Sequence, residues 1–302
     1  MIDFVGKRNL FIIFSIILIV ASLVSIFTKG FNLGVEFLGG SEIILRVEAD
    51  IDEGTVRNII KDLAPEFENA RITKIKSIDD PANISKFSIV VSPKDENGNL
   101  KVYAGEEKEQ ISKKLVQKFE ENNLKALVAG FNETSGYAAQ EIKNLTWKAI
   151  VFTLIAILLY ITVRFQFVFG IGAVLALIHD VIITLGFFSF FNYELNVAAI
   201  AAVLTLIGYS LNDTIVVYDR IRENLRRLRG KKITDIVNES INQVIKRTIN
   251  TSLTTFIVVF VLLLFSGNSI KPFAFGMTIG VIIGTYSSLY IASPVVIRWI
   301  KR

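Results

Sequence analysis

Asp213 is the residue of this chain whose type and position most clearly point to chemistry. It follows Asn212 within an apolar run, between Leu211 and Ile215. A carboxylate at membrane depth costs several kcal/mol unless it is paired, hydrated or protonated. Counted inward from Asp219, where the polar sequence resumes, Asp213 lies roughly 9 Å deep at 1.5 Å per residue. We therefore predict a functional carboxylate at Asp213 and a weaker candidate at Asn212, the alternative being an Asn–Asp pair that only joins helices by hydrogen bonds.

Arg247 stands at the start of the next apolar run, on the same side of the membrane as Asp219. An arginine side chain reaches a carboxylate one helical turn deeper, and a nearby opposite charge stabilises the ionised form of a carboxylate. If this bias varies with conformation, Asp213 becomes a switchable proton site. The sequence therefore predicts that Asp213 and Arg247 form a proton-coupling pair. The alternative for Arg247 is a basic anchor at the inner interface.

His179 and Asp180 form a second ionisable pair, near the middle of an earlier apolar run. Two such groups at that depth are costly. Adjacent helical residues point about 100° apart, so both cannot face one partner squarely. The pair is either a structural polar contact or part of the proton path of Asp213. The hydroxyl residues between positions 251 and 255 could relay hydrogen bonds, although such residues more often only pack.

The elements that must position these residues are membrane-spanning helices. The chain has 302 residues, 52% of them hydrophobic, which is too apolar for a soluble protein of this length. About 20 apolar residues cross the hydrocarbon core as a helix. Six runs approach or exceed this length: Leu10–Phe27, Leu145–Val163, Val168–Phe191, Val197–Tyr218, Ile249–Phe265 and Phe273–Ile297. The runs lack in–out alternation, which excludes a membrane β-barrel.

Several classes of function lack the residues they need. The chain has no cysteine and a single histidine, so disulfides, thiolate metal sites and multi-histidine metal sites are excluded. No nucleophile–base arrangement or phosphate-binding loop is present, so we expect neither an enzyme nor a bound cofactor. The net charge of +5 follows from basic residues that gather on one side of the membrane, and it does not indicate a nucleic-acid partner.

Residues 29–144 are predicted to form an α+β domain between the first two spans. The hydrophobic pattern predicts strands at Gly40–Glu48, Arg71–Ser77, Lys86–Ser92 and Lys125–Phe131, and helices at Asp52–Leu63 and Glu106–Phe119. The order β-α-β-β-α-β is ferredoxin-like, which by itself specifies no function. The chain thus divides into residues 1–28 with the first span, the domain 29–144, and residues 145–302 with spans two to six.

Basic residues predict the orientation. The segment 219–246 carries a cluster of them: Arg220, Arg222, Arg226, Arg227, Arg229, Lys231, Lys232 and Lys246. The segments 192–196 and 266–272, on the opposite side, contribute only Lys271. The positive-inside rule then places both termini in the cytoplasm and the domain 29–144 outside, with the first span a retained signal anchor. Within 219–246, an apolar face predicts a helix lying on the membrane surface: Ile236, Val237, Ile241, Val244 and Ile245.

Gly276, Gly280 and Gly284 recur every four residues in the sixth span. Small residues at this spacing let helix backbones approach closely. The stripe therefore predicts close helix packing, within the subunit or between subunits, and no chemistry of its own.

Three stretches of this sequence resemble the SecF family of protein-export membrane proteins: Ala176–Thr184, Gly208–Asn224 and Arg247–Thr255. The segment after the first span also resembles the family's Gly-Ile-Asp-Phe-x-Gly-Gly motif, through Gly34, Glu36, Gly39 and Gly40. Glu36 stands where aspartate is usual. The resemblance covers nearly the whole chain, and it extends more distantly to half of a resistance-nodulation-division transporter.

The resemblance implies a subunit of the bacterial inner membrane that works with SecD and the SecYEG channel. Such a subunit uses the proton-motive force to help a preprotein leave the channel on the outer side, surrounded by membrane lipid. By motif position, the residues implicated in proton movement are Asp213 and Arg247. Two alternatives stay open: a scaffold that conducts no protons, and a half-transporter for a hydrophobic small molecule.

Overall fold

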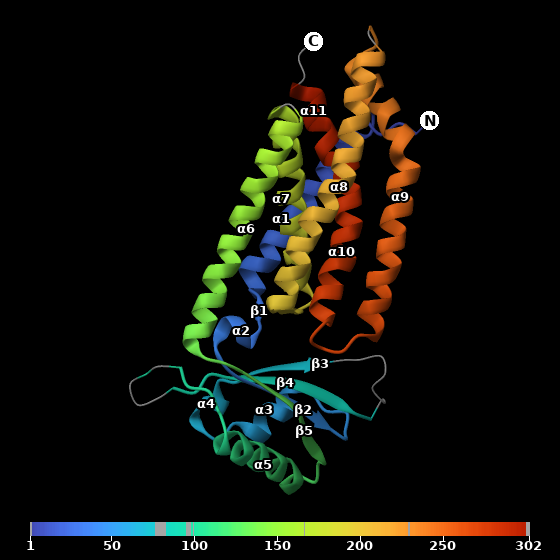
Figure 1. Ribbon diagram of the computed structural model, residues 1–302. Coiled ribbons are helices and arrows are strands. Elements are labelled where there is room, and N and C mark those ends of the chain that lie inside the picture. The colour runs from blue at the N-terminus through green and yellow to red at the C-terminus, as the bar shows by residue number, and fades with distance from the viewer. Residues whose placement is uncertain are drawn as a thin grey trace. The chain divides into compact units, whose positions relative to one another are not determined.

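The chain folds into two compact units in a computed structural model, which describes residues 2–75, 83–94, 98, 100–165, 167–228 and 230–299 (Figure 1). Unit 1 comprises Met1–Asn32 with Trp147–Arg302, and unit 2 comprises Leu33–Thr146. The last two residues of the predicted strand Arg71–Ser77 lie outside the described residues. The basic residues Arg229, Lys301 and Arg302 lie outside them as well.

Unit 1 is built from long helices. Six helices are long and apolar enough to cross a membrane, which confirms the predicted number of spans and makes the chain a multi-pass membrane protein. They are α1 (Arg8–Lys29), α6 (Gly136–Arg164), α7 (Phe167–Phe190), α8 (Val197–Arg227), α9 (Ile233–Phe265) and the last span, which runs through α10 (Lys271–Ser287), η1 (Ser288–Ala292) and α11 (Ser293–Trp299). The first residues of α6 belong to unit 2.

Local chemistry explains where several of these helices begin and where one of them changes. The side chain of Asn196 caps α8 by accepting a hydrogen bond from the amide of Ala199 at 3.0 Å. Pro272 stands in the first turn of α10, where its missing N–H is not needed. Pro294 removes an amide from the interior of the last span, and the π-helical turn η1 directly precedes it.

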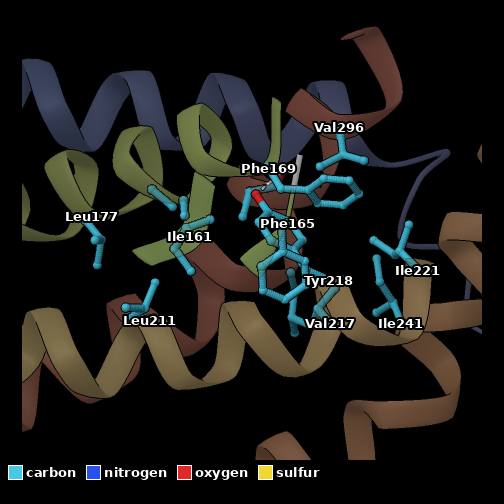
Figure 2. Packing of buried hydrophobic residues seen from close by; sticks show 14 of the residues in the cluster. Ile161, Phe165, Phe169, Leu177, Leu211, Val217, Tyr218, Ile221, Ile241 and Val296 are labelled. Carbon is cyan, nitrogen blue, oxygen red and sulfur yellow. Dashed lines mark hydrogen bonds between the residues drawn. The ribbon is translucent and has the colours of Figure 1, made fainter. Parts of the chain in front are cut away.

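One hydrophobic core of unit 1 gathers around Tyr218 (Figure 2). The tyrosine is fully buried, and its ring meets those of Phe165 and Phe169 edge-on, with centroids 6.3 Å and 4.9 Å away. Ile221 and Ile241 extend the same cluster from α8 and α9. An aromatic centre of this kind buries much apolar area and favours edge-to-face geometry.

The prediction of a separate helix on the membrane surface is wrong. Ile236 and Ile241 belong to α9, which continues without a break into the fifth span, and both side chains are buried in unit 1. α8 continues past the apolar run to Arg227, and Gly230, at a φ of +99°, lies in the turn between α8 and α9. Segment 219–246 is thus an antiparallel helical hairpin. The side chain of Asn224 joins α8 to α9 by donating to Ser240 at 2.9 Å and to Gln243 at 2.8 Å.

The N-terminal segment is tied to α9. The side-chain oxygen of Asn238 accepts from the amide of Phe4 at 2.8 Å, and that of Asn242 accepts from the amide of Ile2 at 2.8 Å. Both asparagines also donate to the carbonyl of Ile2, at 3.1 Å and 2.8 Å. These bonds satisfy backbone groups that no regular element pairs.

Unit 2 is an antiparallel sheet with helices. Its elements are α2 (Val35–Leu38), β2 (Gly40–Val47), α3 (Glu53–Ile60), α4 (Pro65–Glu68), β3 (Arg71–Ile75), β4 (Ser85–Val91), α5 (Glu106–Glu121) and β5 (Ala126–Thr134). The strands lie in the order β3-β4-β2-β5, and every neighbouring pair is antiparallel. Two-residue strands also occur at β1 (Asn32–Leu33) and β6 (Glu194–Leu195).

Alternation along the strands builds the core of unit 2. Ile43, Leu45 and Val47 point to one face of the sheet, where they are fully buried in one cluster with Val56 of α3 and Leu115 of α5. The intervening residues of β2 point to the opposite face. The period of two therefore decides which residues form the core.

Candidate functional site

Asp213 is buried among hydroxyl groups. Its side chain is 2% exposed, and its Oδ2 accepts a hydrogen bond from Ser252 of α9 at 3.1 Å. Thr285 of the last span in turn donates to Ser252 at 2.7 Å. Three helices thus meet at this carboxylate, which has a single hydroxyl donor among the described side chains.

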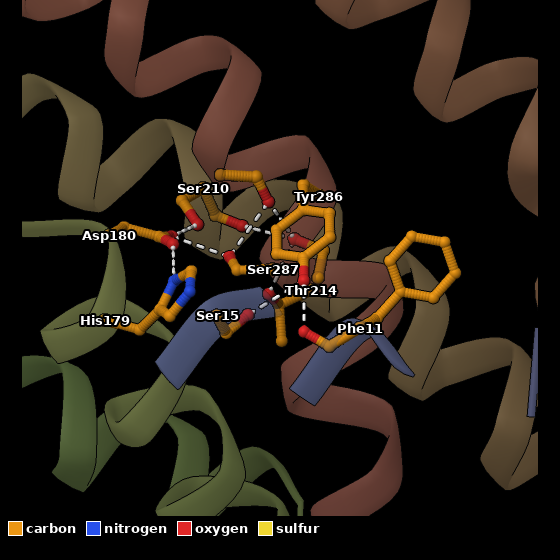
Figure 3. A network of polar contacts seen from close by, with 10 residues as sticks. Phe11, Ser15, His179, Asp180, Ser210, Thr214, Tyr286 and Ser287 are labelled. Atoms are coloured by element: carbon orange, nitrogen blue, oxygen red, sulfur yellow. Dashed lines mark hydrogen bonds and ion pairs between the residues drawn. The ribbon is translucent and has the colours of Figure 1, made fainter. Parts of the chain in front are cut away.

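Asp180 has a fuller set of donors (Figure 3). Its carboxylate is completely buried. Oδ2 accepts from Ser210 of α8 at 2.6 Å and from Ser287 of α10 at 2.8 Å, while Oδ1 lies 2.9 Å from Nδ1 of His179. A buried carboxylate with three partners is much better compensated than one with a single partner.

His179 is therefore the partner of Asp180. The two side chains were expected to diverge by about 100°, but the imidazole turns back onto the neighbouring carboxylate. Its Nε2 is buried without a hydrogen-bond partner in the described chain. The ring also stacks on Tyr286, with centroids 6.1 Å apart.

Tyr286 connects this cluster to the first span. Its hydroxyl donates to the carbonyl of Phe11 at 2.6 Å and lies 2.8 Å from Oγ of Ser15 (Figure 3). Polar groups therefore extend from α1 through the ring contact with His179 to Asp180. The network crosses the helix bundle at one level.

The two carboxylates lie on one continuous framework. Ser210 and Asp213 are one turn apart on α8. Between the two clusters, Thr214 and Ser288 share a hydrogen bond at 3.0 Å, and Ser288 also donates to the carbonyl of Ser210 at 3.4 Å. No direct side-chain bond joins the two carboxylates within the described residues, so a proton passing between them needs a water molecule or a movement.

The glycine stripe of the last span makes this proximity possible. A methyl group on Gly276 would lie 3.0 Å from Ala202, one on Gly280 would lie 2.7 Å from Leu206, and one on Gly284 would lie 2.9 Å from Ser210. The stripe thus faces α8 within this chain. Close backbone contact places the hydroxyls of the last span within reach of α7 and α8.

Arg247 and Asn212 are not bonded to Asp213 in this conformation. Arg247 lies on α9, five residues before Ser252, and its side chain is exposed. In the described part of the chain no ion pair within 4.0 Å joins its guanidinium to Asp213. Asn212 is exposed on α8, so the residue next to the buried carboxylate points outward.

The Gly-Gly motif shapes a tight turn in unit 2. Gly34 precedes α2, which carries Glu36, and Gly39 and Gly40 follow it with φ angles of +75° and +117°. A methyl group on Gly40 would lie 2.2 Å from the carbonyl oxygen of Val91. Only glycine fits this close approach of β2 to β4.

Burial raises the pKa of Glu36 in α2, and the charge of Glu42 adds to this effect.

Sequence reasoning missed Ser210 and Ser287, the two donors to Asp180. Both lie in otherwise apolar helices, where a hydroxyl often bonds to its own backbone. Thr205 does so, donating to the carbonyl of Ala201 at 2.7 Å. The positions of Ser210 and Ser287 carried a weak signal, because Ser210 precedes Asp213 by one turn and Ser287 follows the glycine stripe.

Comparisons with known proteins agree on one family. The family described as "Protein export membrane protein SecD/SecF, C-terminal" matches residues 108–302, and the "SecD/SecF GG Motif" matches residues 24–51. A protein translocase subunit SecF from Petrotoga mobilis is 52% identical, covering 100% of this chain and 97% of the relative. A SecF from Calditerrivibrio nitroreducens is 43% identical, covering 98% and 93%.

Solved structures agree in fold. The crystal structure of SecDF from a Thermus species, described as a translocon-associated membrane protein, superposes with a TM-score of 0.84 at 31% identity. A second SecDF structure, in a super-membrane-facing form, gives a TM-score of 0.67 at 32% identity. Each covers 99% of this chain, which spans 38% of the SecDF chain.

Proposed function

Because this chain belongs to the SecF family of protein translocase subunits, we propose that it works with SecD to use the proton-motive force in late steps of preprotein export through SecYEG. It is an accessory subunit of the Sec translocase. Asp213 is the group that binds and releases the proton, and Arg247 biases its charge state.

The observation that carries this proposal is the environment of Asp213. The carboxylate is 2% exposed and has one hydroxyl donor, Ser252, at 3.1 Å. An ionised carboxylate so poorly compensated at membrane depth is costly, and proton uptake removes that cost. Asp180, which has three partners, is compensated without a proton. The two carboxylates therefore differ in how strongly each one needs a proton.

Arg247 supports the proposal by its position. It precedes Ser252 on the same helix by five residues, which is about 7.5 Å along the axis. Its guanidinium is exposed here and is long enough to approach Asp213 when α8 and α9 shift. An arginine that approaches in one state and withdraws in another makes proton affinity depend on conformation.

His179 and Asp180 are proposed as a second proton-accepting group on the same path. His179 holds a buried Nε2 with no partner among the described residues, and an imidazole nitrogen can either donate or accept a hydrogen bond. The hydroxyls of Ser210 and Ser287 orient the Asp180 carboxylate. A water molecule between this cluster and Asp213 would complete a path across α8.

The driving force is large enough for such a mechanism. Moving one charge across 100 mV is worth about 2.3 kcal/mol. An energy of this size shifts a two-state equilibrium by more than tenfold. The proposal is that packing changes at Asp213 are coupled to motion of unit 2.

Exposed polar residues on α8 and α9 support a proposed contact surface for SecD. Along α8 the exposed residues at membrane depth include Thr205, Gly208 and Asn212, and along α9 they include Arg247 and Asn250. Amides and guanidinium groups facing lipid are costly, whereas helix interfaces in membranes are rich in small and polar residues. The helices of SecD are therefore proposed to pack on this contact surface, with lipid around the remaining apolar surface.

Unit 2 is proposed to be a ferredoxin-like domain on the outer side of the inner membrane. The support is its strand-helix-strand-strand-helix-strand order and the antiparallel sheet β3-β4-β2-β5. The basic residues of the α8–α9 hairpin support a cytoplasmic location for that end and for both termini. In this position unit 2 can meet a preprotein emerging from the channel.

The test compares preprotein export by inverted vesicles that contain this chain, SecD and SecYEG, with and without a proton-motive force. Asp213→Asn is expected to lose the force-dependent part of export and to keep the rest. The matched control is Asp219→Asn on the same helix, which removes an exposed carboxylate 3.6 Å from Arg164 and is expected to export like the unmodified chain. Co-purification with SecD verifies assembly of each variant.

The scaffold hypothesis makes the opposite prediction. If Asp213→Asn exports like the unmodified chain with and without the proton-motive force, the carboxylate is only a helix contact and the proposal is refuted.

A further inference from the structure

The last span contains a π-helical turn at a point where three spans meet. The turn η1 covers Ser288–Ala292 and directly precedes α11, whose second residue is Pro294. A π-turn holds one residue more than a regular turn, and such turns are rare and concentrate at functional sites. Pro294 gives a physical cause, because its missing N–H prevents regular bonding to Tyr290.

Tyr218 of α8 is bonded to this turn. Its hydroxyl donates to the carbonyl of Ala292, the last residue of η1, at 3.2 Å. The ring has no exposed surface and is held in place by Phe165 and Phe169 (Figure 2). The packing of the ring therefore fixes the position of the Tyr218 hydroxyl independently of its hydrogen bond.

Gly172 of α7 makes room for this bond. A methyl group at that position would lie 2.4 Å from the Tyr218 hydroxyl and 3.4 Å from the carbonyl oxygen of Ala292. Both atoms of the hydrogen bond thus sit against one glycine. A side chain there would push the hydroxyl away from its acceptor.

The same three helices meet again at Asp180. On α7, Gly172 and Asp180 are eight residues apart, and on α8 Ser210 and Tyr218 are also eight apart, which is about 12 Å along each axis. On the last span, Ser287 bonds Asp180 and Ser288 bonds Thr214. The π-turn begins at the carboxylate cluster and ends at the Tyr218 bond.

We propose that Tyr218 is a positioning residue for the proton-coupling cluster: its bond to Ala292 holds the π-turn in register, so that Ser287 and Ser288 stay on Asp180 and Thr214. Moving the extra residue out of the turn, even though Pro294 leaves the carbonyl of Tyr290 unbonded, would rotate α11 relative to α10 by about 100°, the angle of one residue. The serines and the Tyr218 bond cannot both be kept through such a rotation. This inference rests on the proposed proton-coupling function for its consequence, but not for its geometry.

The first experiment measures the geometry alone. Backbone hydrogen exchange of residues 288–299 is followed by mass spectrometry in the full chain in nanodiscs. Tyr218→Phe is expected to raise exchange there roughly threefold to tenfold, the loss expected for one hydrogen bond. The matched control is Tyr209→Phe, on the same helix, whose hydroxyl is buried without a partner among the described residues, and no rise is expected. Equal exchange in both variants would overturn the proposal.

A double-mutant cycle tests the role of Gly172. Gly172→Ala alone is expected to raise exchange as Tyr218→Phe does, because the added methyl displaces the hydroxyl. In the Tyr218→Phe background the same methyl no longer meets the hydroxyl, so the double variant is expected to show little further change. Additive effects would place the two residues in separate contacts and overturn the proposal.

The third experiment separates positioning from structural support. In the vesicle assay, Tyr218→Phe is expected to lower only the force-dependent part of export, whereas a loss of structure would lower export under both conditions. Unchanged force-dependent export with a loosened turn would overturn the positioning role. If Asp213→Asn keeps full force-dependent export, the proposed function fails independently of the exchange result.

Discussion

Replacing Gly40 with alanine is expected to destabilise unit 2 by about 4 kcal/mol, far more than an ordinary glycine substitution. Two effects add. The φ angle of +117° lies in a region that L-residues rarely occupy, which costs roughly 1 to 3 kcal/mol. The new methyl group would also lie 2.2 Å from the carbonyl oxygen of Val91 and 3.0 Å from the Cα of Ser92, and overpacking of this kind costs roughly 1 to 3 kcal/mol.

The steric effect cannot be relieved by a side-chain movement. Both obstructing atoms belong to the backbone of β4 and the residue that follows it, and Val91 is the register partner of Ser41. Moving β4 away weakens the β2–β4 ladder at the centre of the sheet. The matched control is Gly105→Ala, because Gly105 has a φ of +56° with nothing within 4 Å of the added methyl. That variant has the conformational cost alone, roughly 1 to 3 kcal/mol, without the steric one.

Thermal proteolysis of the full chain in nanodiscs measures the difference. A loss of 1 kcal/mol lowers the melting temperature of a small domain by roughly 4 to 8 °C. The two variants differ by the steric cost, about 2 kcal/mol, which predicts a gap of roughly 8 to 16 °C. If Gly40→Ala melts no lower than Gly105→Ala, the close approach of β2 to β4 at this position is refuted.

Three further predictions concern a buried carboxyl group, a helical hairpin and a helix contact. Because burial raises the pKa of Glu36 above its usual 4.5, the contribution of its protonated carboxyl group to stability is complete below pH 4.5 and is lost as the pH rises through the raised pKa. Glu36→Gln should therefore stabilise unit 2 at neutral pH relative to acidic pH. Melting temperatures of the two proteins that run parallel against pH would contradict this. Asn224→Ala removes two hydrogen bonds from the α8–α9 hairpin and is expected to cost roughly 2 kcal/mol, seen as faster proteolysis at the turn between the helices; unchanged cleavage would show that the apolar contacts suffice. Gly186→Ala places a methyl 2.2 Å from the Cβ of Ser22 and should separate α1 from α7, lowering the melting temperature in detergent. Gly208→Ala, with nothing within 4 Å of the added methyl, should not lower it, because alanine is more stable than glycine inside a helix.

The spans could be predicted because their signal is local. A run of apolar residues long enough to cross a bilayer has few other stable uses, and all six predicted spans are present. The strands of unit 2 follow from alternation, which places Ile43, Leu45 and Val47 on the buried face. Their ends shift by one to three residues because hydrogen bonding, not hydrophobicity, decides where a strand stops.

The sequence could not predict that the first part of α9, before the apolar run that starts at Ile249, belongs to the same helix as the fifth span. An apolar stripe such as Ile236, Val237 and Ile241 is the same whether a helix lies on lipid or packs on protein. The partner decides between these outcomes, and here it is Ile221 of α8, in the same buried cluster. That contact depends on α8 continuing past the membrane, so a local pattern could not reveal it.

The sequence singled out the two carboxylates of the candidate site and the hydroxyl segment that contains Ser252, the donor to Asp213, but it missed Ser210 and Ser287. Asp180 and Asp213 stand out because a carboxylate in an apolar run is expensive wherever it points. The donors to Asp180 come from Ser210 and Ser287, which are 30 and 107 residues away in sequence. A serine in an apolar helix costs little because its own backbone can accept the hydroxyl, so only the fold shows which serines serve a carboxylate.

The length of α9 makes it a lever for the hydrogen bond at Asp213. Its 33 residues form a rod about 50 Å long, which packs on the α8 hairpin and the N-terminal segment in its first part and on the last span through Ser252 and Val259 further along. If the rod pivots near Val244, Ser252 lies about 12 Å from the pivot and Phe265 about 32 Å from it. A sideways displacement of about 3 Å at Phe265 then moves Ser252 by about 1.1 Å, which stretches its 3.1 Å bond to Asp213 beyond hydrogen-bonding distance. A movement at the Phe265 end of α9 that also carries its contacts with Met277 and Val281 would therefore remove the hydroxyl donor from the buried carboxylate.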